Sequence, residues 1–339
     1  MQVKKYIVMA VCLLCCLFFF AKCGYHSTDH NDGIPWEVRD EIHAISQKVV
    51  EGLSTGDIET LKAIDLDSTI TIDEMVEISE RFGPSMQGKE FITTSDYQSR
   101  CIGFGKKAFP IPSQSKPPFT ILIEVECGKS YFTSLMSTQG EHADLSLSLV
   151  FVKRKKTWKL RGFYLGQIRI AGRNAVQWYE EAKKMADKNH LLPALLRMHL
   201  ATGEILRPAP YIQYTQEFEI RRFAKSLQSD FEREHKYSFD VSELQSSPVI
   251  YNITSDFVKN DLFPMVRYVT SNSLDDAQAL QHEAELMTKA LQERFPGITD
   301  YYTHIAFKAF SEPPTDPTRV YTTYTVVVEV EDVGVREKR

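Results

Sequence analysis

The stretch DLSLSLVFVKRKKTWKLRGFYL, residues 144–165, alternates in hydropathy on both sides of a short basic run. In the first half, apolar residues fill every second position, opposite two serines: Leu145, Leu147, Leu149 and Phe151 against Ser146 and Ser148. In the second half, one face carries Trp158, Leu160 and Tyr164. A period of two is typical of strands. The stretch therefore predicts a β-hairpin with Lys153–Lys156 at its tip.

Helices are expected before this hairpin. Residues 36–53 repeat apolar side chains at intervals of three and four. A break at Ser54–Asp57 then caps a second helix through Ile64, and Thr71-Ile72-Asp73-Glu74 has the spacing of a capping box for a third. From Glu90 the period changes to two, with a clear strand around residues 119–127. Helices followed by an antiparallel sheet indicate an α+β fold.

This order resembles a known family. Gly56-Asp57-Ile58-Glu59-Thr60-Leu61 after an amphipathic helix, together with the closing hairpin Leu147–Leu165 and its Trp158, resembles the nuclear-transport-factor-two-like (SnoaL-like) cone domains. The resemblance covers roughly residues 37–170. It implies a curved sheet around a cavity, in a family that contains both enzymes and exported binding proteins. It therefore implies a fold and a pocket but no reaction.

The remainder predicts two further segments. Residues 171–237 read as helical, with prolines at 208 and 210 ending one helix. Residues 246–333 read as a ββαββ unit, in which a helix packs on a small sheet. We therefore expect a signal peptide at 1–22, a polar tether at 23–35, a cone-like α+β domain at 36–170, a helical segment, and the C-terminal ββαββ domain.

The N-terminus predicts export. Lys4 and Lys5 precede Tyr6–Ala21, an uncharged and mostly apolar run of 16 residues, which is short for a membrane span of about 20. Ala21-Lys22-Cys23-Gly24 resembles the end of a bacterial lipoprotein signal, which implies lipidation of Cys23. Lys22 departs from that pattern, since the family prefers a small residue there.

Three alternatives to lipidation at Cys23 stay open. Leu13-Leu14-Cys15-Cys16 is a second candidate for the lipidation box. An ordinary signal peptidase that cuts after Cys23 would free a soluble protein from Gly24. The apolar run could also stay attached as a signal anchor.

Two cysteines lie outside the N-terminal segment. Cys101 and Cys127 are 26 residues apart and predict either one disulfide, which an exported protein can form, or two buried thiols. No histidine accompanies them, so we expect no metal site and no cofactor.

Candidate catalytic residues are weak. His142 with Asp144 and Glu141, and Tyr164 on the returning strand, could form an acid–base group at the mouth of a cone. The alternative is a polar turn that enters the strand. His282-Glu283 lacks the second histidine of a zinc protease and predicts a solvated helix face.

The hairpin tip is the main candidate for surface contact. Lys153, Arg154, Lys155 and Lys156 gather on a chain of formal charge −5, which becomes −8 without residues 1–22, because these carry Lys4, Lys5, Lys22 and no acid. Such a tip can contact anionic lipid headgroups, or it can simply be a solvated hairpin end. The acidic balance argues against nucleic-acid binding.

Together these features predict an exported, lipid-anchored envelope protein. The folded part would lie in the periplasm or outside the cell, held at the cell membrane or outer membrane. It would bind a small ligand or another envelope protein without catalysis. Two other hypotheses remain, an enzyme that uses the cone cavity and a secreted interaction protein without lipid.

Overall fold

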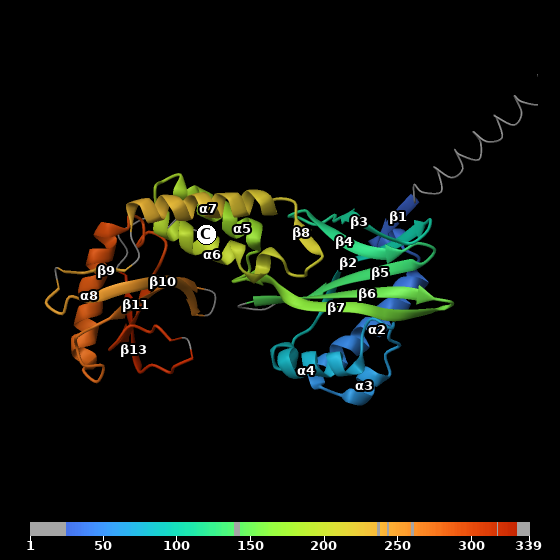
Figure 1. Cartoon of the computed structure of the whole chain (residues 1–339), viewed down its shortest axis with the longest axis horizontal. Coiled ribbons are helices and arrows are strands. Elements are labelled where there is room, and N and C mark those ends of the chain that lie inside the picture. Colours follow the sequence, from blue (N-terminus) through green and yellow to red (C-terminus); the bar gives the residue numbers. More distant parts are fainter. Residues whose placement is uncertain are drawn as a thin grey trace, which may run out of the picture. The chain divides into compact units, whose positions relative to one another are not determined.

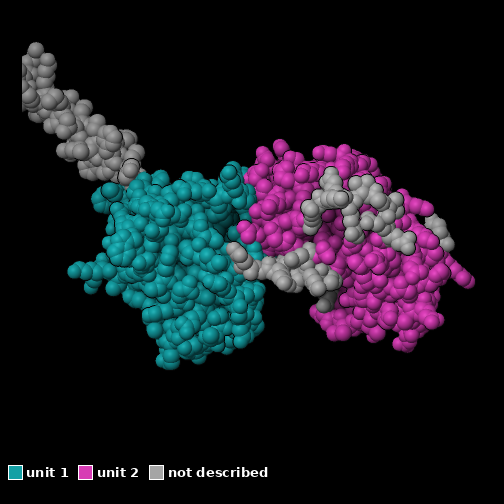
Figure 2. All heavy atoms as spheres, turned by 180° about the vertical axis from the view of Figure 1, so that it is seen from behind, with its two compact units in different colours: residues 1–140, 144–168, 207–215 teal, residues 141–143, 169–206, 216–339 magenta. Residues whose placement is uncertain are grey.

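The computed structural model describes residues 25–138, 143–235, 238–242, 244–258, 261–316 and 318–330. The fold is α+β, as predicted. The chain divides into two compact units, which Figure 2 colours separately. Unit 1 contains residues 1–140, 144–168 and 207–215. Unit 2 contains 141–143, 169–206 and 216–339.

A five-stranded sheet in the order β1-β2-β5-β6-β7 forms the centre of unit 1 (Figure 1). Its strands are β1 (Tyr25–His30), β2 (Ile92–Ile102), β5 (Ser130–Ser137), β6 (Ala143–Arg154) and β7 (Thr157–Ile170). The β6–β7 pair is the hairpin quoted above, with Lys155-Lys156 as its turn. Lys155 adopts a left-handed backbone, with φ +57°.

Three helices cover one face of this sheet: α2 (Trp36–Thr55), α3 (Ile58–Lys62) and α4 (Ile72–Met86). Gly56 ends α2 with φ +70°, the Asp57 side chain caps α3, and Thr71 and Glu74 form the predicted capping box of α4. Apolar side chains fill the space between helices and sheet, and the largest is Trp158, which is 2% exposed. The space between these helices and the sheet therefore holds the apolar core of unit 1.

A second sheet covers the opposite face. It has the order β3-β4-β8, with β3 (Lys106–Pro112), β4 (Phe119–Glu126) and β8 (Ile212–Tyr214). His26 of β1 stacks on Phe109 of β3, and the Tyr211 hydroxyl donates to the Ser148 carbonyl of β6. The serines at 146 and 148 are buried by this second layer.

The predicted polar tether at 23–35 is wrong from residue 25 onward. Tyr25–His30 is a strand that pairs antiparallel with β2, from Tyr25 opposite Ile102 to His30 opposite Tyr97. A short 3₁₀ turn at Asn31–Gly33 leads directly into α2. The segment reads as a tether because its residues are polar, but its alternate side chains, such as Thr28 bonded to Ser99, face the second sheet layer.

Cys101 and Cys127 form a disulfide and are not two separate buried thiols. It links the end of β2 to the connection between β4 and β5. The Gly128 amide donates to the Cys101 carbonyl (2.8 Å) and the Cys127 amide donates to the Gly105 carbonyl (2.9 Å). Two chain crossings between the sheets are thus tied together at one point.

Unit 2 begins with α5 (Ala175–Ala186) and α6 (Leu191–Thr202), then a 3₁₀ turn at Glu204–Leu206, and continues with α7 (Glu217–Glu234). The predicted helical segment 171–237 is interrupted, because Ile212–Tyr214 forms β8 in unit 1. The sheet of unit 2 has the order β13-β12-β11-β10-β9, in which the edge strand β9 is Phe239–Asp240.

The ββαββ order is present in this second unit: β10 (Val249–Val258), β11 (Asp261–Val269), α8 (Ala277–Arg294), β12 (His304–Phe310) and β13 (Thr323–Glu329). The α8 helix connects β11 to β12, which pair in parallel. Among the described residues, no helix is long and apolar enough to cross a membrane.

Gly166 gives a direct test of how residues 207–215 dock in unit 1. A Cβ on Gly166 would lie 2.2 Å from the Pro208 carbonyl oxygen, whereas a Cβ on Gly162 of the same strand meets nothing closer than 4.0 Å. We expect Gly166→Ala to lower the free energy of unfolding by about 1–3 kcal/mol through overpacking, and Gly162→Ala to change it much less. Urea unfolding followed by tryptophan fluorescence measures both. Equal midpoints for the two variants would contradict this packing.

Candidate functional site

The candidate site lies where the turn end of the β6–β7 hairpin meets residues 65–70. The Asp67 amide donates to the Leu160 carbonyl (2.8 Å), and the Leu160 amide donates to the Asp65 carbonyl (2.9 Å). This parallel bridge extends the edge of the sheet beyond β7. Leu66 packs on the apolar core, so the alternation directs Asp65 and Asp67 to the other side, toward Lys159 and Arg161.

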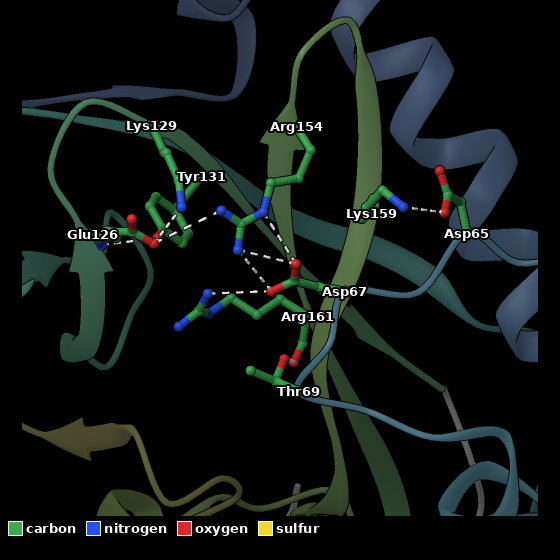
Figure 3. Close-up of polar contacts among 9 residues, drawn as sticks. All are labelled: Asp65, Asp67, Thr69, Glu126, Lys129, Tyr131, Arg154, Lys159 and Arg161. Atoms are coloured by element: carbon green, nitrogen blue, oxygen red, sulfur yellow. Dashed lines mark hydrogen bonds and ion pairs between the residues drawn. The ribbon is translucent and has the colours of Figure 1, made fainter.

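Asp67 is the centre of the site. Its carboxylate is 5% exposed and accepts hydrogen bonds from Arg154 Nε (3.1 Å), Arg154 Nη2 (3.2 Å) and Arg161 Nη1 (3.3 Å). The Arg154 contact has the two-pronged geometry that suits a guanidinium and a carboxylate. Figure 3 shows the two arginines reaching Asp67 from neighbouring strands. One buried carboxylate therefore fixes two cationic side chains.

The network extends from Arg154 to β4 and β5. Arg154 Nη1 lies 3.7 Å from a carboxylate oxygen of Glu126, which also pairs with Lys129. The Arg161 guanidinium lies 5.6 Å from the ring centre of Tyr131. The Tyr131 hydroxyl accepts from the Glu126 amide (2.8 Å), and burial raises its pKa. At the sheet edge, Lys159 Nζ donates to Asp65 Oδ1 at 2.7 Å.

An open cleft of about 590 Å³ lies against this network. Asp67 and Ser68 contribute polar groups, Arg154 and Lys159 contribute cations, and Leu66 and Ile70 contribute apolar surface. A mixed lining of this kind suits a ligand with an anionic group and an apolar part.

The charge around the cleft is opposite to that of the whole chain. Residues 153–161 carry six cations and no carboxylate, against Asp65 and Asp67 on the facing segment. This leaves a local formal excess of four positive charges on a chain of charge −5. A local concentration of one sign attracts ligands of the other.

The four predicted headgroup contacts are not equivalent. Arg154 is drawn to Asp67 and Glu126, and Lys153 Nζ lies 5.2 Å from the ring centre of Trp158. Lys155 and Lys156 form the exposed turn. The buried carboxylate therefore holds Arg154 in place, and the contact of these four cations with lipid headgroups stays a prediction.

The pairing of Asp65 and Asp67 with Lys159 and Arg161 was not predicted from the sequence. The sequence does contain one pattern that matches these pairs. Two acids at positions i and i+2 complement two cations at i and i+2, and a parallel bridge aligns the pairs. The two segments are 94 residues apart, so nothing local connects them.

Of the predicted catalytic group, the structure describes Asp144 and Tyr164. Asp144 is buried at 4% exposure, whereas Tyr164 is 39% exposed, and neither lines the cleft beside Asp67. His142, Glu141 and the lipidation candidate Cys23 lie outside the described residues. No group of three potential metal ligands occurs in the part of the chain that the structure describes.

The prediction of a solvated face at His282-Glu283 is wrong for Glu283. This side chain is 3% exposed, and its carboxylate accepts from the Thr270 hydroxyl (2.9 Å) and from Nδ2 of the Asn272 side chain (3.0 Å). These contacts join the start of α8 to the segment after β11.

A histidine–aspartate pair in unit 1 was also missed. His43 Nε2 of α2 lies 2.6 Å from Asp96 Oδ2 of β2, and Ser134 of β5 donates to Asp96 Oδ1 at 2.8 Å. In a nucleophilic triad the serine bonds to the histidine, whereas here the carboxylate stands between them. The cluster therefore joins α2 to the sheet and does not activate the serine.

Comparisons of this chain with protein-family models, with curated proteins and with solved structures found no match. The resemblances to cone domains and to lipoproteins therefore stay predictions that rest on the motifs themselves.

Asp67 and Asp65 provide a matched pair of substitutions. Asp67→Asn leaves two partly buried guanidinium groups without their carboxylate, so we expect a loss of about 1–3 kcal/mol in the free energy of unfolding. Asp65 is 51% exposed, and Asp65→Asn should cost less than about 1 kcal/mol. Urea unfolding compares them, and a larger loss for Asp65→Asn would contradict the central position of Asp67.

Proposed function

We propose that the chain is an exported protein, held at a membrane by lipid on Cys23, that binds a phosphate-bearing anion in the basic cleft without catalysis. The observation that carries this proposal is the cleft itself, in which Arg154 and Lys159 are held beside about 590 Å³ of open space.

The arrangement of cations supports anion binding. Asp67 orients Arg154 and Arg161 before any ligand arrives, which lowers the entropy lost on binding. Arg154, Lys159 and Arg161 form four ion pairs with Asp65, Asp67 and Glu126. These pairs use only part of the positive charge, because residues 153–161 keep an excess of four cations over Asp65 and Asp67. Guanidinium and ammonium groups in this setting suit phosphate oxygens.

Export is supported by two independent features. The apolar run Tyr6–Ala21 after two lysines has the composition of a signal sequence. The Cys101–Cys127 disulfide suits an oxidising compartment. Multiple acyl chains on Cys23 would then give a stable anchor, at roughly 0.8 kcal/mol for each buried CH₂.

Palmitate labelling with membrane fractionation in bacterial cells tests the anchor. We expect the wild type to be labelled and membrane-bound, and Cys23→Ala to lose both properties because its acylated thiol is gone. Cys16→Ala is the matched control and should keep both, because it alters only the alternative box.

Each other result points to a defined alternative. Loss of the label in Cys16→Ala alone would place the anchor at the earlier box. An unlabelled, soluble wild type whose mature mass begins at Gly24 would contradict the anchor and favour the secreted protein.

Glycerol phosphate, a headgroup phosphate without acyl chains, tests the cleft. We expect Lys159→Gln to weaken its binding to the detergent-solubilised full chain by roughly tenfold, the equivalent of one charge-assisted hydrogen bond. Lys62→Gln is the matched control, because Lys62 also pairs with an acid, Glu59 at 2.9 Å, but on α3. Isothermal titration calorimetry measures both variants. Equal affinities would contradict anion binding in the cleft.

A further inference from the structure

The strand register brings three separate features to one end of the five-stranded sheet. Strand β1 begins at Tyr25, opposite Ile102 at the end of β2. Strand β5 begins at Ser130, opposite Arg100, and the end of β6 pairs with the start of β5, Tyr131 opposite Val152. The start of the described chain, the β2–β3 loop and the β6–β7 turn therefore share this end (Figure 1).

The β2–β3 loop exposes large apolar side chains there. Ile102 is 69% exposed and Phe104 is 83% exposed. The loop is held on both sides, because the disulfide anchors Cys101 and the Gly105 carbonyl accepts from the Cys127 amide (2.9 Å). Gly105, with φ +75°, supplies the left-handed turn that returns the chain into β3. The disulfide and this hydrogen bond thus fix the loop that exposes the two apolar side chains to solvent.

The length of chain before β1 limits how far this end can lie from a membrane. Four residue steps separate Ala21, the last of the apolar run, from Tyr25. At no more than about 3.6 Å per residue they span roughly 14 Å. Cys23 is two steps from Tyr25, or roughly 7 Å. Because β1 uses the residues expected to form a tether, almost no spacer remains.

We propose that this end of unit 1 lies directly on an anionic bilayer, with Phe104 and Ile102 inserted at the level of the headgroups and Lys155 and Lys156 against the lipid phosphates. The proposal rests on the membrane anchoring proposed above and adds the orientation of the folded unit. Apolar side chains beside exposed cations are the combination that binds a charged bilayer surface. The short spacer delivers this combination to the bilayer and leaves a protein partner little room between them.

Tryptophan quenching by lipid-borne bromine tests the orientation. The full chain carries Phe104→Trp or, as matched control, Ile92→Trp at the far end of strand β2, where Ile92 is 46% exposed. Strand β2 separates Ile92 from Ile102, next to Phe104, by ten residues, or roughly 33 Å of extended chain. Each protein is reconstituted into phosphatidylglycerol–phosphatidylcholine vesicles with or without brominated acyl chains, and the wild-type emission of Trp36, Trp158 and Trp178 is subtracted.

We expect emission from the tryptophan introduced at position 104 to shift to the blue and to lose most of its intensity with brominated lipid. The tryptophan introduced at position 92 should keep its intensity. Lys155→Glu combined with Lys156→Glu should reduce the quenching at position 104, because the cations that hold this end on the phosphates are reversed.

The other outcomes separate the orientation from the anchor. Equal quenching at both positions in a vesicle-bound protein overturns the orientation and leaves the anchor intact. A blue shift at position 104 without bromine quenching overturns the proposed orientation, and it indicates that Trp at this position contacts protein and not lipid. A chain that does not bind the vesicles contradicts both this inference and the proposed anchor.

Discussion

The five-stranded sheet of unit 1 is covered on both faces, and this double burial determines where the other elements of the unit lie. The helical face is mostly apolar, and α2, α3 and α4 pack on it through one core, beside which Asp96 bonds to Ser134 and to His43 of α2. The other face carries serines, threonines and tyrosines, and a second sheet closes over it. Polar groups enclosed there need partners, because an unpaired buried group costs about 1–3 kcal/mol. The disulfide and the returning segment 207–215 hold that second layer in place.

Periodicity was enough to predict the elements that pack on the apolar core. The quoted hairpin, the helices before it and the ββαββ order all appear. The face predicted for the second strand of the hairpin is wrong for Tyr164, because Phe163 and Leu165 pack on the core instead. Strand β1 escaped because its sequence YHSTDH contains no aliphatic residue and faces a polar layer. Strand β8 escaped because three residues are too short for a periodic signal. Both strands form because of partners far away in the sequence, β2 for β1 and β4 for β8, and local periodicity does not report such partners.

The basic site illustrates the same limit in electrostatic terms. The cationic tip was visible as a local run, but its organisation depends on Asp67, which is 87 residues from Arg154. Nothing local in the sequence links the two segments, although the i and i+2 spacing of Asp65 and Asp67 matches that of Lys159 and Arg161. The buried carboxylate of Asp67 holds the guanidinium groups of Arg154 and Arg161 in fixed positions. The wall of the cleft is thereby rigid, while the lysines at the turn remain exposed to solvent.

Unit 1 is discontinuous, and this has a consequence for its synthesis. Its last strand, β8, pairs with β4 through Phe119 opposite Tyr214 and Ile121 opposite Ile212, yet nearly 40 residues of unit 2 are encoded before it. A ribosome or an export channel that delivers the chain from its N-terminus releases α5 and α6 before β8. Until then the edge of β4 has no partner, and such an edge invites pairing with other chains. The order of emergence therefore creates an interval in which the nascent protein needs protection, and residues 207–215 end it.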